Sequence, residues 1–492
     1  MKILILSFFD DNFGDMLIRT CFTQLLKVVL QNLQAEAELT FMPLKSLEKE
    51  KIAEAELIIF PGGALFGFSY LGLLEDFETV LDIAEKNDIP VVFSSLGLNN
   101  AGATDENEPY LTALLHKKCI KALSVRDSVT AFRRYAGDVP YTITPVCDPA
   151  VWAGYVYAAD LKPKSADRPI VGINVVRGGL FKDNGVDFVL HNEVEYLSAL
   201  AEELENHGIE TCFFTNGQTL DCNTLRFFAK ECEVPVEKLS LPDTAREVVQ
   251  AISRFDAVAA IRMHASIISY ALGVPALNLV WNPKIPDFYE MIGHPERALM
   301  PGEWSPALVA EQIRHMLDEK DYRPDPAVLM TLYRFLYETM QELLQKDGAP
   351  EMLDFETVCE RLKSMRVPDE EDVTDLRLKV RRSESRYLSL FTVNRRQKDE
   401  IRNLKIQNKT LNGEKKSLEK AAERELQQSK KALQNAEKKW QATKKELADV
   451  QKKNEKMQKE LNHLNKTLAV RLHKRLGRIK RFLLRHLRGK KS

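Results

Sequence analysis

"AVAAIRMHASIISYALGVPALNLVWNPKI", residues 257–285, is the most apolar stretch of this 492-residue chain. AVAAI predicts a buried strand, ASIISYAL the start of a helix, and PALNLV a second strand. Gly273 and Pro275 predict the end of that helix, since glycine favours the position after a helix and proline cannot continue one. The resulting β-α-β unit indicates a parallel sheet covered by helices. Arg262 and His264 fall between its first strand and its helix.

The same alternation of apolar runs and amphipathic helical stretches extends from residue 1 to about residue 365. It predicts an α/β fold with two Rossmann-like domains, 1–160 and 166–365, joined by a polar segment that contains prolines. Helices from about Pro306 to Met365 are expected to close the second domain. The predicted strands are KILILSF, AELIIF, PVVFSS and ALSV in the first domain, and PIVGINV, ETCFFT, AVAAI and PALNLV in the second.

Composition narrows the class of protein. Seven cysteines are scattered without metal-ligand or redox spacing, which indicates a reducing compartment. The N-terminal run MKILILSFF is short and ends in DDNFGD, so we interpret it as a first strand and not as a signal peptide. No run reaches the roughly 18 apolar residues of a membrane span. We therefore expect a cytoplasmic protein.

Beyond residue 372 the period of the sequence changes. Leu433, Trp440, Leu447, Asn454, Leu461 and Leu468 recur every seven residues, which predicts a coiled coil over 373–468 and a homo-oligomer. An eight-residue step from Leu418 to Leu426 predicts a stutter in the supercoil. The alternative is a long solvated helix with an interrupted apolar stripe.

The last segment, 469–492, is basic. Eleven Lys or Arg and no Asp or Glu lie between Lys466 and Lys491, although the whole chain has a net charge of −1. Leucines at helical spacing opposite these cations predict an amphipathic helix on an anionic membrane surface, at the inner face of the plasma membrane. Nucleic-acid contact and a solvated tail are the alternatives. Because the apolar face is so complete, no nucleic-acid partner is expected.

Ligands of open α/β sheets bind beyond the carboxyl ends of the strands, so the loops there are the candidate sites. After the first strand, Asn12, Gly14 and Asp15 form a tight turn into a helix. After ELIIF, Gly62 and Gly63 let the backbone approach an anion or a sugar. Either loop could also serve only to connect a strand to a helix.

Two further loops carry cations. Arg126 ends the strand ALSV, directly before a helix that Asp127 or Ser128 can cap, and we expect its side chain to face the ligand crevice. Its alternative role is to pair with Asp127 or Asp148. Arg262 and His264 occupy the corresponding junction of the second domain. A histidine in this setting is more often structural, but the neighbouring arginine and the lysine of NPK after the next strand favour a functional role.

These segments together resemble the polysaccharide pyruvyl transferases. NFGD, PGGALFG, SVRDSVTAF, CDPAVW, RMHASIISYALGVPALNL and NPK occur in the order and context of that family, over about residues 1–320. The resemblance implies two Rossmann-like domains in a GT-B-like arrangement. It also implies transfer of a pyruvyl group from phosphoenolpyruvate to two hydroxyls of a sugar in a cell-surface glycan or its precursor, which is free or lipid-linked. The coil and the tail lie outside it.

By matching motifs, Arg126, Arg262 and Lys284 would bind the donor and His264 would be the general acid. The chemistry agrees, because guanidinium groups bind carboxylate and phosphate bidentately and an imidazolium can protonate the donor methylene. Asp15 is the candidate base or acceptor contact, ahead of Asp148. The resemblance implies neither a metal nor a cofactor.

Two other functions stay open at this point. A nucleotide-sugar glycosyltransferase could use the same two domains and place a cation on a diphosphate. A coiled-coil scaffold could carry a transferase-like domain without activity. Phosphoenolpyruvate turnover separates the first alternative from pyruvyl transfer, and replacement of His264 separates the second.

Overall fold

A computed structural model describes the fold. It describes residues 1–8, 12–67, 71–99, 108–161, 168–186, 190–319, 322–345, 348 and 350–367, together with 437, 438, 440, 441, 444 and 452. The chain divides into two compact units, Met1–Thr374 and Asp375–Ser492. Within the described residues, none of the helices combines the length and the apolarity that a bilayer crossing requires.

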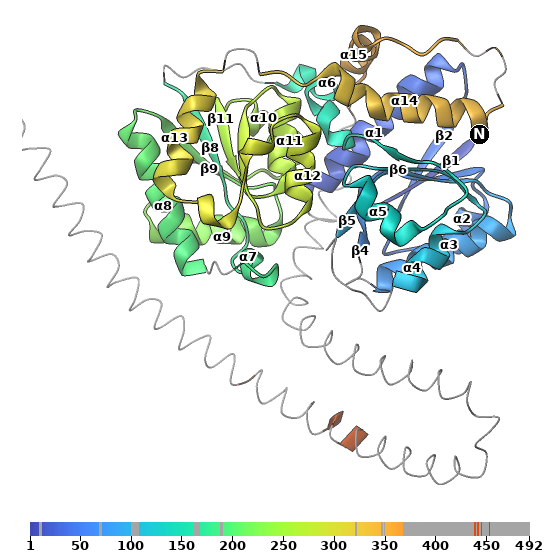
Figure 1. The fold of residues 1–492 in the computed structure, drawn as a ribbon, viewed down its shortest axis with the longest axis horizontal. Helices are drawn as coiled ribbons and strands as arrows, with labels where there is room; N and C mark the ends of the chain where they lie inside the picture. Colours follow the sequence, from blue (N-terminus) through green and yellow to red (C-terminus); the bar gives the residue numbers. More distant parts are fainter. Residues whose placement is uncertain are drawn as a thin grey trace, which may run out of the picture. The chain divides into compact units, whose positions relative to one another are not determined.

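The first sheet of the larger unit is parallel and has seven strands (Figure 1). Its order is β2 (Glu38–Pro43), β1 (Lys2–Ser7), β3 (Leu57–Phe60), β5 (Val91–Asn99), β6 (Ile120–Val125) and β7 (Ile143–Pro145), with β4 (Gly63–Gly67) also paired to β5.

The second sheet is also parallel and has six strands. Its order is β10 (Leu239–Ser240), β9 (Glu210–Phe214), β8 (Ile170–Asn174), β11 (Ala257–Ala260), β12 (Ala276–Leu279) and β13 (Ala298–Leu299).

Helices cover both faces of each sheet. Along β1, Ile3 and Ile5 pack with α1 in one core, whereas Leu4 and Leu6 pack in another with the helices of the opposite face. Because both faces are buried, the strands are apolar at every position and not at alternate ones. The α-helices are α1 (Phe13–Asn32), α2 (Lys49–Ala53), α3 (Leu71–Lys86), α4 (Glu108–Leu115), α5 (Val129–Ala136), α6 (Ala153–Val156), α7 (Leu180–Asp183), α8 (Leu190–Asn206), α9 (Thr219–Glu231), α10 (Ala245–Ile252), α11 (Met263–Ala271), α12 (Lys284–Met291), α13 (Pro306–Leu317), α14 (Pro326–Leu343) and α15 (Phe355–Ser364).

Five short 3-10 helices complete the described elements. They are η1 (Pro149–Trp152), η2 (Ala158–Asp160), η3 (Val236–Lys238), η4 (Pro295–Arg297) and η5 (Pro301–Glu303).

The eight predicted strands are all present, and the α/β class with two parallel sheets is confirmed. The β11-α11-β12 unit forms as predicted. Helix α11 ends at Gly273, whose φ of 66° is left-handed and whose N–H donates to the carbonyl of Tyr270. The sequence missed β2, β4 and β7 as well as the two-residue strands, which lie at edges or are short.

The segment PGGALFG is not the loop expected from its glycines. Gly62 and Gly63, with φ of 131° and 102°, turn the chain out of β3, and the chain then continues as strand β4. This strand pairs with β5, so the backbone groups of the segment belong to the sheet. Glycine is required here for the left-handed backbone, whatever ligand binds nearby.

The helices after the second sheet return to the first half of the chain. Helices α14 and α15 pack on α1, and α15 also contacts α6 (Figure 1). The domain boundaries drawn from the sequence remain predictions. The predicted coiled coil, 373–468, and basic tail, 469–492, lie outside the described residues apart from six isolated helical positions.

Candidate functional site

His264 lies where the loops of the two sheets meet. It is the second residue of α11, directly after β11, and its side chain is 13% exposed. Gly14, at the start of α1, presses on the imidazole, because a Cβ built on this glycine would lie 2.2 Å from His264 Nδ1. The helix start that follows the first strand is therefore one wall of the histidine site.

The other wall is a buried carboxylate. Asp148, which is 2% exposed, caps η1 by accepting a hydrogen bond from the Ala150 N–H. Its Oδ2 accepts a hydrogen bond from Arg126 Nη1 and lies 3.9 Å from His264 Nε2. That nitrogen makes no hydrogen bond within the described part of the chain. Asp148 therefore connects the first-sheet arginine to the histidine.

Arg126 is more enclosed than the sequence suggested. Its side chain is 2% exposed and does not open freely into a crevice, because Asp148 and Asp127 both pair with it, the latter at 3.8 Å. Gly97 of β5 makes room for the guanidinium, since a Cβ there would lie 2.9 Å from Arg126 Nε. Burial lowers the pKa of this arginine, but the two carboxylates outweigh it and raise the pKa overall. Arg126 thus pairs with both carboxylates considered as its structural partners.

Burial keeps His264 neutral, and the surrounding cations add to this effect. Burial lowers its pKa from 6.5 to about 3; Asp148 opposes this shift, whereas Arg126, Lys284 and Arg262 add to it. An anion placed among these cations would reverse their effect on the imidazole. The site therefore combines a neutral, buried imidazole with three cations within electrostatic reach.

Lys284 starts α12 after β12, and its Nζ lies 5.6 Å from the centre of the Trp281 ring. Its pKa is lowered from 10.5 to about 8, first by burial and then by the positive charges of Arg126 and Arg262, while the carboxylates of Asp127 and Asp15 oppose the shift. It is consequently protonated at neutral pH.

Asp127 is a buried carboxylate to which the sequence assigned only a capping or pairing role. Ser128 is the actual cap of α5, with its side chain accepting from the Ala131 N–H. Asp127 Oδ2 instead accepts a 2.7 Å hydrogen bond from the Leu98 N–H. Burial raises its pKa to about 6, although Arg126 and Lys284 oppose that shift.

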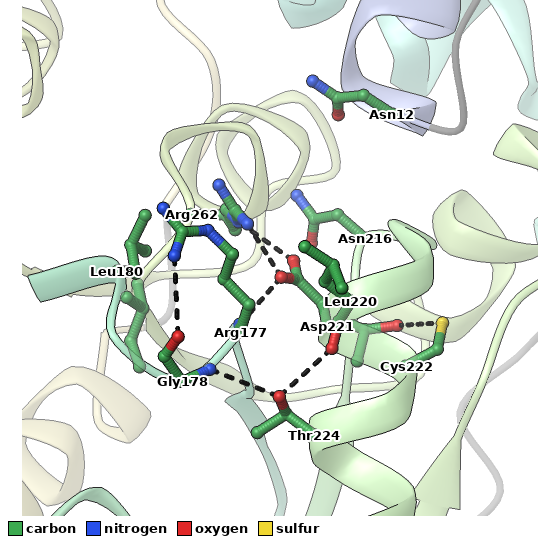
Figure 2. Close-up of polar contacts among 12 residues, drawn as sticks. Asn12, Arg177, Gly178, Leu180, Asn216, Leu220, Asp221, Cys222, Thr224 and Arg262 are labelled. Carbon is green, nitrogen blue, oxygen red and sulfur yellow. Dashed lines mark hydrogen bonds and ion pairs between the residues drawn. The ribbon is translucent and has the colours of Figure 1, made fainter. Parts of the chain in front are cut away.

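Arg262 is fixed by a carboxylate that the sequence analysis did not identify. Its Nε and Nη2 donate to Asp221 Oδ2 and Oδ1 at 2.9 and 2.7 Å (Figure 2). Asp221, which is fully buried at the start of α9, also accepts from the Arg177 N–H at 2.8 Å. This geometry leaves Nη1 of Arg262 for a ligand, since no hydrogen bond within the described residues uses it.

Asp15 lies within electrostatic reach of Lys284 and Arg126. Its Oδ2 accepts a 2.6 Å hydrogen bond from Asn12 Nδ2, while Asn12 Oδ1 caps α1 by accepting from the Gly14 N–H at 3.1 Å. A Cβ on Gly63 would lie 3.7 Å from Asp15 Oδ1. Gly62 packs instead on Ser95 and Ile18.

The structure thus brings the positive charges of Arg126, Arg262 and Lys284 within electrostatic reach of His264. Gly14 joins this group by packing against the imidazole. The sequence missed Asp221 and Arg177, and it gave Asp127 only a capping or pairing role. Arg177 lies in the loop after β8 and Asp221 in the first turn of the helix after β9, so a search of the segments that follow the predicted strands could have found both. Across the described residues, no group of three or more His, Cys, Asp or Glu side chains has an arrangement that could hold a metal ion.

Comparison with known proteins gives one family. The sequence profile of polysaccharide pyruvyl transferases matches residues 12–283, more than half of the chain. No curated protein matches this chain.

Several solved structures are distantly similar. One from Listeria monocytogenes, assigned as a UDP-N-acetylglucosamine 2-epimerase, is 12% identical over 72% of this chain and 99% of its own, with a TM-score of 0.48. The UDP-GlcNAc 2-epimerase of Methanocaldococcus jannaschii is 12% identical over 70% and 100%, with a TM-score of 0.43. A heptosyltransferase of E. coli is 13% identical over 64% and 100%, with a TM-score of 0.36. These values carry no conclusion about function.

Proposed function

The chain belongs to the polysaccharide pyruvyl transferase family, and on that premise we propose that it moves a pyruvyl group from phosphoenolpyruvate to two hydroxyls of one sugar. The observation that supports this most directly is the neutral histidine enclosed by three cations. Phosphoenolpyruvate carries about three negative charges, on a carboxylate and a phosphate. Arg126, Lys284 and Arg262 all act electrostatically on His264, so a donor bound among them would charge the imidazole.

The donor contacts follow from which groups are free. Lys284 and Nη1 of Arg262 can meet the donor directly. Arg126 is already paired with Asp148 and Asp127, so the donor carboxylate would have to replace one of these carboxylates at the guanidinium. Otherwise Arg126 acts through its charge and by holding Asp148 beside His264. In both cases the positive charge of Arg126 attracts the anionic donor, and in the second case Asp148 also favours the protonated form of His264.

The reaction then proceeds in two additions. His264 gives its proton to the methylene carbon, which becomes the ketal methyl, and positive charge develops at the neighbouring carbon. The first sugar hydroxyl adds there and loses its proton. The bond from that carbon to the phosphate oxygen then breaks and phosphate leaves with the bonding electrons. The second hydroxyl adds to the resulting cationic carbon and loses its proton, which completes the ketal. Of the two hydroxyl protons, the balance places one on the methyl group and one on the phosphate products.

Asp15 is the proposed base for a hydroxyl. Asn12 holds its carboxylate through Oδ2, beside the turn at Gly63. Its charge raises the pKa values of Lys284 and Arg126, so the carboxylate lies within electrostatic reach of the cations that would bind the donor.

Release of phosphate from phosphoenolpyruvate tests this function. The protein is incubated with the donor and a panel of free and lipid-linked sugars, in wild type and in His264→Gln. General acid catalysis predicts a loss of about 10²- to 10⁴-fold in the variant. His315→Gln, on an exposed histidine of α13, is the matched control and should keep full activity.

Three outcomes would contradict the proposal. Absence of acceptor-dependent phosphate release across the panel, with nucleotide-sugar turnover instead, would favour a glycosyltransferase. Equal phosphate release by wild type and His264→Gln would exclude His264 as the general acid. Absence of both phosphate release and nucleotide-sugar turnover would leave the scaffold alternative.

For the C-terminal part we propose that residues 373–468 form an oligomeric coiled coil and that 469–492 contact an anionic membrane surface. The support is the heptad pattern and the basic amphipathic pattern of the sequence. Together they would hold a cytoplasmic enzyme near the membrane leaflet where glycan precursors are assembled.

A further inference from the structure

The inference concerns three hydrogen-bond donors at the second sheet that the proposed donor site does not use fully. Arg177, Asn216 and Arg262 follow β8, β9 and β11, which are neighbours in the sheet. Loops that leave adjacent parallel strands at their carboxyl ends lie side by side, where ligands of such sheets bind. Figure 2 shows the three side chains around the carboxylate of Asp221.

Asp221 fixes two of the three loops relative to each other. Its Oδ1 accepts both the Arg177 N–H, at 2.8 Å, and Arg262 Nη2, at 2.7 Å. A fully buried carboxylate with all these bonds does not change partner readily. The backbone of the Arg177 loop and the guanidinium of Arg262 are therefore held together before any ligand arrives.

Asn216 offers a donor that is already oriented. It is 2% exposed, and its Oδ1 accepts from Nδ2 of the buried Asn174 at 3.3 Å. Asn174 Oδ1 in turn accepts from the Arg262 N–H at 2.9 Å. Nδ2 of Asn216 makes no hydrogen bond in the described part of the chain, and Figure 2 shows it directed toward the side of Arg262. Because Oδ1 is engaged, the amide orientation is fixed, and Nδ2 is a donor that a ligand can use.

Arg177 adds a guanidinium group whose present partner, Asp183, an anionic ligand can replace. Its side chain is 30% exposed and pairs at 2.6 Å with Asp183, which is 59% exposed. An exposed ion pair of this kind contributes little, so an anion can replace Asp183 at small cost. Gly178 and Gly179 follow directly, and the φ of 82° at Gly179 turns the loop without a side chain.

We propose that these three donors bind the diphosphate of a sugar 1-diphosphate, so that the acceptor is a sugar still attached to its carrier. The inference rests on the proposed function for the reaction itself. Arg262 connects the two sites, since it is held by Asp221 and its charge also acts on His264 and Lys284. A diphosphate bound beside Arg262 would anchor the acceptor next to the donor cations.

Binding of inorganic pyrophosphate to the full-length protein tests the site. Calorimetric titrations are run with phosphoenolpyruvate already saturating, so that pyrophosphate cannot bind in place of the donor and has to bind beside it. We expect pyrophosphate to bind, and Arg177→Gln to weaken it by about 10-fold or more, as expected for a charge-assisted hydrogen bond. Arg226→Gln, on an exposed arginine of the same α9, should stay within about twofold. Asn216→Ala should weaken binding as well.

Two further titrations identify the carrier. UDP represents a nucleotide-linked sugar and geranyl diphosphate a polyprenyl-linked one. Tighter binding of either than of inorganic phosphate, with the same loss in Arg177→Gln, supports the site and names the source of the diphosphate.

The inference is overturned if pyrophosphate does not bind while phosphoenolpyruvate is saturating, or if Arg177→Gln and Arg226→Gln bind pyrophosphate equally well. It is also overturned if neither UDP nor geranyl diphosphate binds better than inorganic phosphate. Its failure can be told from failure of the proposed function. Phosphate release from phosphoenolpyruvate with an uncharged sugar acceptor would survive in the first case and be absent in the second.

Discussion

Donor binding should be coupled to proton uptake by His264. In the unliganded protein its pKa is about 3, so the imidazole is neutral at pH 7. To act as an acid it must reach a pKa of about 7 in the donor complex, a rise of about 4 pKa units or about 5.5 kcal/mol. Two donor charges at about 5.5 Å, with an effective dielectric constant of about 20, supply about 6 kcal/mol. The charge of the donor is therefore sufficient by itself to raise the pKa of His264 to about 7.

The sign of the pH dependence follows from this shift. A group whose pKa rises on binding strengthens binding at low pH, and the gain is lost as pH rises through the pKa of the complex. Between those two pKa values, affinity for phosphoenolpyruvate should fall by about tenfold per pH unit through His264 alone. The phosphate of the donor titrates near pH 6 and adds its own dependence.

Calorimetry in buffers of different ionisation enthalpy measures the protons exchanged. At pH 7 we expect wild type to take up about 0.5 to 1 proton more per donor than His264→Gln, because the variant retains only the titration of the donor and of the other groups. His315→Gln is the matched control and should behave as wild type. Equal proton uptake in wild type and His264→Gln would refute the reasoning, even if the variant were inactive.

Three other predictions follow from single contacts. Gly14→Ala places a methyl group 2.2 Å from an imidazole nitrogen, so kcat should fall by about 10-fold or more in steady-state assays, whereas Gly302→Ala, which has open space around it, should leave kcat unchanged. A normal kcat in the first variant would show that the imidazole can move freely. Asp221→Asn leaves the partly buried Arg262 without its counter-charge and should lower the free energy of unfolding in urea by about 3 kcal/mol, against at most about 1 kcal/mol for Asp183→Asn on an exposed carboxylate; equal losses would contradict the bidentate pair. Removal of 469–492 should weaken sedimentation with anionic liposomes in a salt-dependent way while leaving phosphate release intact, and unchanged sedimentation would exclude the membrane role.

Local sequence was enough to predict the central strands of both sheets and the end of α11. The strands were predictable because both faces of each sheet are buried, which makes apolar runs such as LIIF of β3 continuous. The end of α11 was predictable because Gly273 and Pro275 act on their own backbone. The positions of Arg126, His264 and Lys284 after strands were predictable as well, because the end of a strand can be recognised from the local sequence.

The partners of those side chains depended on tertiary structure. Sequence offered Asp127 and Asp148 as alternative partners of Arg126, and the structure uses both, which encloses the arginine that was expected to face a crevice. Nothing local links Arg262 to Asp221, which lies 41 residues earlier and meets it only because β8, β9 and β11 are neighbours.

The protonation state of the site was likewise a tertiary property. From sequence, His264 is a group of ordinary pKa near neutrality and Gly14 is a turn residue. Folding presses the glycine onto the imidazole, removes water, and brings three cations from separate loops within electrostatic reach. The sequence determined which chemical groups stand at the strand ends. Only the tertiary structure decided that the histidine is neutral, because its pKa depends on burial and on the charges of residues that are distant along the chain.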